Sequence, residues 1–420
     1  MTVALAKTDF RPAAEVIENR FPAHVQPAAQ PKTLEAYLAA ARSILPVLKE
    51  HAAQTRQQRR PADESVAAIV EAGLAGIMRP AMFGGPGLEL SDMIAVGSVL
   101  GEGCASTAWD YVVWEVHCWM AGTLPEQGQR EFYADPVVLC CGASNTTKAK
   151  ARAVEGGYML SGRWGFGSGS THASWTCVFS AIDGEEVDGR PHVRMMIVPR
   201  PAFCVEDTWR VQGLAGTGSH DIVIAEEVFV PAHRTISRAE VATGRAEGGR
   251  LHDTAAYRMP LPPGAHLATD SSAIGLARAV IAEFREVITK RTYVTGKAQA
   301  DMPGSMIRLA TAEIEVRAAE LLLQDTMREI EAHLRTGAEL TVEQRAKARM
   351  VAGYVPDLCK QVITSLIAAC GASAMLEGSK LAAALLDVTM MSLHQSTEYD
   401  RGPENYGRVL IGLEPSNIAI

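Results

Sequence analysis

The chain has 420 residues, of which 47% are hydrophobic and 21% are charged. Its 40 Lys and Arg residues against 48 Asp and Glu residues give a formal net charge of −8. This balance disfavours a nucleic-acid-binding protein, because phosphate binding needs a basic surface, and the apolar fraction excludes a chain that is disordered throughout.

The cysteines and the N-terminus predict a cytoplasmic protein. The eight cysteines are scattered through apolar stretches without a Cys-x-x-Cys pair, as expected of free thiols in a reducing compartment. Residues 1–20 have no sustained apolar segment ahead of their charges, so we expect no signal peptide. The most apolar window, 104–124, contains Asp110, Glu115 and His117, which a membrane span tolerates poorly. We therefore expect a buried helix there and no membrane contact.

The first third of the chain predicts an arm and a helical domain. Residues 1–32 are rich in Pro and Ala and lack periodicity, so we assign them to an N-terminal arm. Residues 33–135 show helical periodicity. Helix starts are indicated after Pro61, at Leu90 and near Ser106.

Residues 136–240 predict a β domain. A Glu-Gly-Gly turn at 155–157 joins two of its segments as a hairpin. The predicted strands are 137–144, 149–154, 158–166, 175–181, 193–198, 203–207 and 221–230. Their short spacing favours a single antiparallel barrel or sandwich.

Residues 241–420 predict a C-terminal helical bundle. The expected long helices are 271–293, 305–336, 342–370 and 378–398. They are apolar on more than one face, which favours a four-helix bundle that also builds an oligomer. The fold class is thus α+β and mainly α, with a helical domain, a β domain and a helical bundle in that order; the family resemblance described below implies that the β domain is an antiparallel β-barrel.

Several common catalytic motifs are absent from the sequence. The glycines of 213–218 are spaced G-x-x-G-x-G and precede a predicted strand, so a dinucleotide-binding turn is not indicated. Phe166 stands where a G-x-S-x-G elbow around Ser168 would need glycine. The eleven histidines are dispersed without an H-E-x-x-H motif, so we expect no metal site.

Polar residues within apolar surroundings remain as site candidates. Helical spacing places Asp110, Trp114 and His117 on one helix face. Taken alone, His117 fits a hydrogen-bonded core residue better than a catalyst.

A second set lies at the ends of predicted elements. Ser144 ends a strand, Ser168 and Ser170 lie in a glycine-rich stretch after the hairpin, and His394 lies near the end of the last helix. Turn and helix-cap chemistry explains these residues as well as a site does.

The order of several short motifs resembles the acyl-CoA dehydrogenase superfamily. Within it, the chain resembles the oxygenase components of two-component flavin-dependent monooxygenases, including those that hydroxylate p-hydroxyphenylacetate. The resemblance runs from about residue 40 to the C-terminus and rests on the order and spacing of segments 59–61, 83–85, 104–109, 155–162, 168–173, 216–219 and 406–415.

The resemblance implies a cofactor and partners. FMN or FAD would arrive already reduced from a separate NAD(P)H-dependent flavin reductase, which agrees with the missing dinucleotide-binding turn. With O₂ it would form a C4a-hydroperoxyflavin that hydroxylates a small phenolic or indolic substrate. The family also implies a homotetramer.

The resemblance also implies residue roles on the flavin side of the site. Ser168 matches the serine beside flavin N5, and His394 matches a histidine near flavin C4a. Trp109, Gly169 and Ser170 complete the implied cofactor-binding set.

On the substrate side, His117 and Ser144 match the pair that contacts the phenolic oxygen. Together with Ser168 and His394 they form the implied catalytic set. Trp114, Asp110 and Arg258 are assigned to substrate binding.

The chain also departs from the family pattern. Thr389 replaces a frequent histidine, and Ser396 replaces a tyrosine. No arginine matches the family's carboxylate-binding position in 257–263, where Arg258 is the nearest substitute. Asp110 and Glu115 are unusual acids that would either bind an amine or indole N–H or, as we favour, form salt bridges within the fold.

These departures leave the substrate open. An N- or S-oxygenating monooxygenase of the same fold is the main alternative, since only the pocket differs. An acyl-CoA dehydrogenase is less favoured, because its late Glu-Gly segment is missing and 142–145 replaces its Thr-Glu strand motif. A non-enzymatic binding protein is the least favoured.

Overall fold

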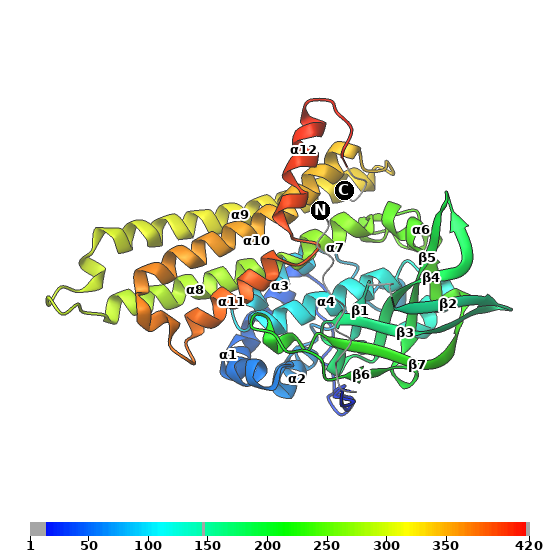
Figure 1. Ribbon diagram of the computed structural model, residues 1–420, viewed down its shortest axis with the longest axis horizontal. Coiled ribbons are helices and arrows are strands. Elements are labelled where there is room, and N and C mark those ends of the chain that lie inside the picture. The colour runs from blue at the N-terminus through cyan, green and yellow to red at the C-terminus, as the bar shows by residue number, and fades with distance from the viewer. Residues whose placement is uncertain (1–13, 145–147, 417–420) are drawn as a thin grey trace, which may run out of the picture.

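The computed structural model describes residues 14–144 and 148–416 and arranges them in three regions (Figure 1). A β-sheet lies at one end, and three long helices run side by side away from it: α8 (Ser271–Lys290), α9 (Pro303–Arg335) and α10 (Val342–Cys370). Helices α3 and α4 lie between the sheet and these helices. The first region contains α1 (Leu34–Gln58), α2 (Asp63–Glu71), α3 (Leu90–Gly101), α4 (Ala105–Ala121) and α5 (Glu126–Phe132). Within the described ranges, no helix is long and apolar enough to cross a membrane.

Helix α4 is the buried helix expected in the window 104–124. Every one of its residues is buried except Val113 and His117, which lie one turn apart and are half-buried. A helix enclosed on all sides needs neighbours on all sides, and α4 packs against α3, β1, α7 and α8. Val113 and His117 therefore mark the one strip of α4 that faces open space.

The sheet contains eight strands in the order β6-β7-β3-β2-β4-β5-β8, with β1 paired to β4. The strands are β1 (Cys140–Ala143), β2 (Ala149–Val154), β3 (Gly157–Gly167), β4 (Trp175–Val187), β5 (Arg190–Pro199), β6 (Cys204–Glu206), β7 (His220–Pro231) and β8 (Thr235–Ser237). The described part of the N-terminal arm lies beside β6, where Ile17 N donates a hydrogen bond to Val205 O at 2.7 Å.

The expected closed antiparallel barrel is corrected in two respects. The barrel is not closed, because β6 and β8 end the strand order as short, unjoined edges. In addition, β1 and β2 both run parallel to β4, since the β2–β3 hairpin is inserted between β1 and β4 in the chain. Two register shifts in β3 mark bulges or irregularities, which bend a strand without closing the sheet.

The C-terminal region contains the four long helices that the sequence predicts. It comprises α6 (Arg238–Thr243), α7 (Leu261–Thr269), α8 (Ser271–Lys290), α9 (Pro303–Arg335), α10 (Val342–Cys370), α11 (Lys380–Ser392) and α12 (Pro403–Leu410). Helix α11 ends at Ser392 rather than near residue 398, so His394 lies in the turn that follows. The eight cysteines are free thiols, as predicted.

Candidate active site

Two indole N–H groups of α4 bond to the turn that follows β3. Trp109 Nε1 donates to Ser168 Oγ at 3.3 Å, and Trp114 Nε1 donates to Gly169 O at 3.2 Å. Gly169 has a left-handed φ of +69°, and a Cβ there would lie 2.2 Å from Trp114 Nε1. Only glycine meets both the conformation and the close approach. This turn therefore fixes α4 against the sheet.

A chain of hydroxyl groups continues from Ser168. Ser168 Oγ lies 2.8 Å from Ser219 Oγ, which lies 2.6 Å from Thr217 Oγ1. Thr217 Oγ1 donates to Leu214 O at 2.9 Å, because a carbonyl can only accept. Each hydroxyl has one hydrogen, so Ser219 donates to Thr217 and Ser168 donates to Ser219.

These assignments leave Ser168 with a single free hydrogen-bonding site. Its hydrogen goes to Ser219, and one of its two lone pairs accepts from Trp109. The remaining lone pair can only accept. A group bound against Ser168 must therefore present an N–H or O–H donor.

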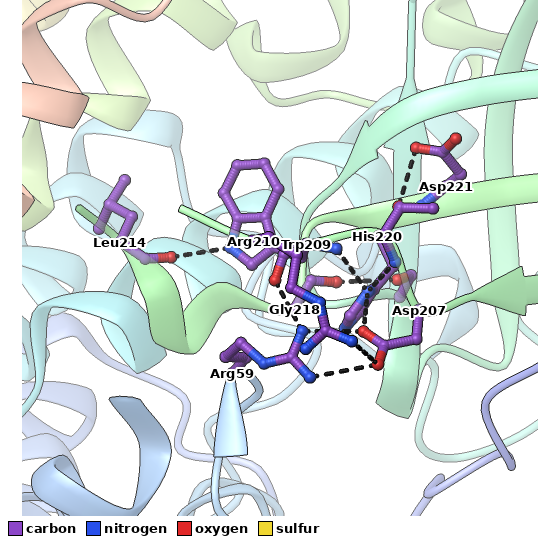
Figure 2. Close-up of polar contacts among 10 residues, drawn as sticks. Arg59, Asp207, Trp209, Arg210, Leu214, Gly218, His220 and Asp221 are labelled. Atoms are coloured by element: carbon purple, nitrogen blue, oxygen red, sulfur yellow. Dashed lines mark hydrogen bonds and ion pairs between the residues drawn. The ribbon is translucent and has the colours of Figure 1, made fainter. Parts of the chain in front are cut away.

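A polar network beside this chain fixes the segment that carries Thr217 and Ser219 (Figure 2). Arg59 binds both carboxylate oxygens of Asp207, at 2.9 and 3.1 Å, and donates to Trp209 O at 3.0 Å. Arg210 donates to the same carboxylate at 2.8 Å. Trp209 Nε1 donates to Leu214 O at 3.1 Å, so it shares its acceptor with the hydroxyl chain.

His220 completes the network as a neutral acceptor. Its Nδ1 accepts the backbone N–H groups of Thr208 and Trp209, both at 3.1 Å. This nitrogen therefore carries no hydrogen, although Asp207 Oδ1 lies 3.5 Å from it. Burial lowers the pKa of His220 to about 4, which agrees with the neutral form.

His117 and Ser144 lie near the end of β1. His117 Nδ1 donates to Val113 O at 2.7 Å, which leaves Nε2 as an acceptor. A Cβ at Gly142 would lie 2.1 Å from this Nε2, so only glycine lets the ring lie against β1. Burial lowers the pKa of His117 to about 4. The residue is thus a neutral base at the half-buried strip of α4.

The loop Leu393–Glu398, here called the His394 loop, connects the two groups of residues. The His394 ring contacts the Trp109 ring edge to face, with centroids 5.3 Å apart. Gln395 Nε2 donates to Ser144 Oγ at 3.1 Å. The structure therefore brings Trp109, Ser168 and His394 together and connects Ser144 to them through Gln395.

The other predicted site residues lie differently. Ser170 Oγ donates to Gly218 O at 3.0 Å, which adds to the turn after β3. The Arg258 guanidinium donates to the carbonyls of His252 and Asp253, both at 3.5 Å. Within the part of the chain that the structure describes, it contacts none of the other predicted site residues.

The two unusual acids of α4 form no salt bridge within the described residues. Glu115 accepts the backbone N–H groups of Gly76 at 2.7 Å and Met78 at 3.1 Å. Asp110 is fully buried, and neither of its oxygens has a hydrogen-bond partner among the described residues. Burial raises its pKa well above the usual value, so the carboxyl group is held neutral.

Comparison with known proteins identifies the family. Residues 33–137 match the acyl-CoA dehydrogenase N-terminal domain, and residues 268–399 match the acyl-CoA dehydrogenase C-terminal domain. The chain is 30% identical to the FADH(2)-dependent resorcinol hydroxylase oxygenase component of Rhizobium sp. (strain MTP-10005), across 89% of this chain and 93% of that protein. The chain belongs to the oxygenase components of flavin-dependent monooxygenases.

Two further comparisons agree with this assignment. The p-hydroxyphenylacetate 3-hydroxylase oxygenase component of Acinetobacter baumannii is 28% identical, with 89% of this chain and 88% of that protein covered. The HsaA monooxygenase structure from M. tuberculosis superposes with a TM-score of 0.84 at 28% identity, covering 92% of this chain and 100% of the other. The predicted resemblance, the fold class and the monooxygenase function are thereby confirmed.

Several residues of the candidate site have contacts that were not predicted from the sequence. Thr217 and Ser219 belong to the motif 216–219, which carried the resemblance but received no role. Gln395 and Ser396 fell within a predicted helix. Ser396 was noted only as replacing a tyrosine of the family pattern. The polarity of both residues beside His394 was the signal that they belong to the site.

The neutral state of His117 is open to direct measurement. Because burial depresses its pKa, the Cε1–H resonance of ¹³C-labelled His117 is expected to stay unchanged between pH 8 and about pH 5.5. The unfolded chain protonates this histidine near pH 6.5, so acidification from there toward pH 4 destabilises the native state through this group. A His117→Asn spectrum assigns the resonance, and a titration midpoint near 6.5 would contradict the burial argument.

Proposed function

We propose that this protein hydroxylates a small phenolic or indolic substrate where α4, the turn after β3 and the His394 loop meet. A separate NAD(P)H-dependent flavin reductase supplies FMN or FAD in reduced form. The observation that carries this proposal is the hydrogen-bond state of Ser168, whose free lone pair can only accept. Reduced flavin presents an N–H donor at N5, whereas oxidised flavin presents a lone pair there.

The flavin side is formed by Trp109, Ser168, Gly169, Ser170 and His394. The Trp109 indole and the His394 ring provide flat surfaces, and the Gly169 backbone permits close approach. A bound reduced flavin supplies the electrons that activate O₂ for transfer of one oxygen atom to the substrate. Ser168 would accept a hydrogen bond from the N5–H group of the reduced flavin.

The substrate side is formed by His117 and Ser144. A phenolic O–H would donate to the free Nε2 of His117, which increases the electron density of the ring and activates it toward an electrophilic oxygen. Buried apolar residues of α4 keep water from the reacting atoms. Asp110 is sealed in the interior and Arg258 is bound to backbone, so neither is included among the proposed substrate contacts.

The relatives support an aromatic substrate. One is named for resorcinol, another for p-hydroxyphenylacetate, and an A. baumannii relative that is 28% identical over 70% of this chain is named for indole-3-acetate. All three compounds are small aromatic rings with an O–H or N–H donor. That donor is the group that a neutral His117 would accept.

We also propose a cytoplasmic homotetramer. Three large apolar side chains of α9, Ile307, Ile314 and Leu321, are 65%, 71% and 51% exposed. They recur every seven residues and therefore lie on one helix face. Burial of this face against other copies of the chain explains the exposure, and the eight free thiols fit a reducing compartment.

The reaction class and the substrate class are tested together by one screen. Purified protein, FMN or FAD, NADH and a generic flavin reductase are incubated in air with phenols, indoles, arylamines and thiophenes, and product masses are measured by mass spectrometry. The expected result is gain of one oxygen atom on a phenol or indole. Oxidation of nitrogen or sulfur compounds alone would contradict the substrate class. Bleaching of bound oxidised flavin by an acyl-CoA would contradict the monooxygenase.

His117 provides a second test of the substrate side. Replacement of His117 by Leu removes the acceptor, so the yield of hydroxylated product per O₂ should fall at least about 100-fold while O₂ consumption continues and hydrogen peroxide accumulates. The matched control is His333→Leu on α9, which also bonds one ring nitrogen to a backbone carbonyl. Unchanged product yield in the His117 variant would remove this residue from the proposed role.

A further inference from the structure

A single buried arginine anchors the His394 loop. Arg349 of α10 is 2% exposed, and among the described residues its hydrogen bonds go to backbone carbonyls of this loop. Its Nη1 donates to Ser396 O at 2.8 Å, and its Nη2 donates to Glu398 O at 2.9 Å and to Gln395 O at 3.4 Å. A planar guanidinium fork can bind several acceptors in fixed directions, which an ammonium group cannot do.

The loop has little apolar packing of its own. Leu393 is 68% exposed, and the two buried loop side chains, Ser396 and Thr397, are polar. Ser396 Oγ lies 2.5 Å from His394 Nδ1 and 3.4 Å from Thr269 Oγ1. Hydrogen bonds, rather than hydrophobic burial, therefore set the position of the loop.

We propose that Arg349 is a positioning residue of the monooxygenase, which holds the His394 loop from the helical bundle so that His394 lies on Trp109 and Gln395 lies on Ser144. This inference rests on the proposed function of that site. It gives α10 an indirect role in the reaction, because Arg349 acts on the site through the backbone of the loop.

Three charged or titratable groups act on Arg349: Asp270, Glu398 and Arg401. Asp270, at the start of α8, is buried with both oxygens unpartnered among the described residues, and burial raises its pKa well above the usual value. The charges of Asp270 and Arg349 interact without a salt bridge among the described residues, and this interaction favours the charged form of each against the larger effect of burial. Glu398, at the end of the loop, and Arg401, in the turn that follows, act on Arg349 with opposite signs.

The charge of Arg349 acts on two histidines. Burial first, and Arg349 second, lower the pKa of His394 to about 4. The same two causes, with a contribution from His394, lower the pKa of His266 on α7 to about 3. Arg349 thus fixes the geometry of the loop and also keeps its imidazole neutral.

Two substitutions separate these effects. Arg349→Lys keeps the charge and loses the fork, so product per O₂ should fall about tenfold or more while the pKa of His394 remains near 4. Arg349→Met loses both, so product per O₂ should fall and the pKa of His394 should rise. The matched control is Arg308→Met on α9, whose guanidinium also binds a backbone carbonyl in the bundle but away from the loop.

The histidine titration is followed by NMR of ¹³C-labelled protein, and thermal unfolding verifies that each variant is folded. Wild-type product per O₂ in Arg349→Lys would overturn the positioning role. An unchanged His394 pKa in Arg349→Met would overturn the electrostatic part, and if that variant does not fold, Arg349→Lys alone decides the proposal. A wild-type enzyme without product, combined with a shifted His394 pKa in Arg349→Met, would refute the proposed function and the positioning role that rests on it, and would leave only the electrostatic effect of Arg349 on the loop.

Discussion

The site depends on two hydrogen bonds from α4 to the sheet. The indole N–H groups of Trp109 and Trp114 are buried, and each has its acceptor in the turn at Ser168 and Gly169. A buried donor without a partner costs about 1–3 kcal/mol, so sliding α4 along the turn would lose both bonds at once. His117 lies about two turns beyond Trp109 on the same helix. The two bonds therefore also set the distance between His117 and Ser168.

This constraint also orients the hydroxyl chain. Because Trp109 donates to Ser168 and Leu214 O closes the chain beyond Thr217, every hydroxyl hydrogen between them has a fixed direction. The network of Arg59, Asp207 and His220 holds the far end of the chain (Figure 2). The protein thereby presents an acceptor at Ser168 before any ligand arrives, and we propose that this preorganised acceptor serves the binding of reduced flavin.

The sequence allowed the elements to be predicted more reliably than their contacts. Apolar periodicity is a local signal, and it predicted helices α8, α9 and α10. The hairpin turn is also a local signal, and it predicted strands β2 and β3. Strand β8 was missed; it spans only Thr235–Ser237, between a short 3-10 turn at Ala232–Arg234 and helix α6. The parallel pairing of β1 with β4 joins segments separated by the β2–β3 hairpin, and one sequence contains no signal for it.

The same limit applies within the site. His117, Ser168 and His394 were found because each stands out locally or matches a family motif, whereas Ser219 and Arg349 act through partners far away in the chain. The polar run after α11 was predicted as helix, since no glycine or proline interrupts it before Gly402. Asp110 was expected to find a partner, but burial keeps it neutral instead.

The central claim is that Ser168 can only accept and therefore selects reduced flavin. The most direct test compares the Kd values of reduced and oxidised FMN and FAD by anaerobic titration of wild-type protein, Ser168→Ala and the control Ser180→Ala on β4. We predict that wild type and Ser180→Ala bind reduced flavin about tenfold more tightly than oxidised flavin, and that Ser168→Ala loses most of this preference. Equal affinities in wild type, or an unchanged preference in Ser168→Ala, would contradict the account.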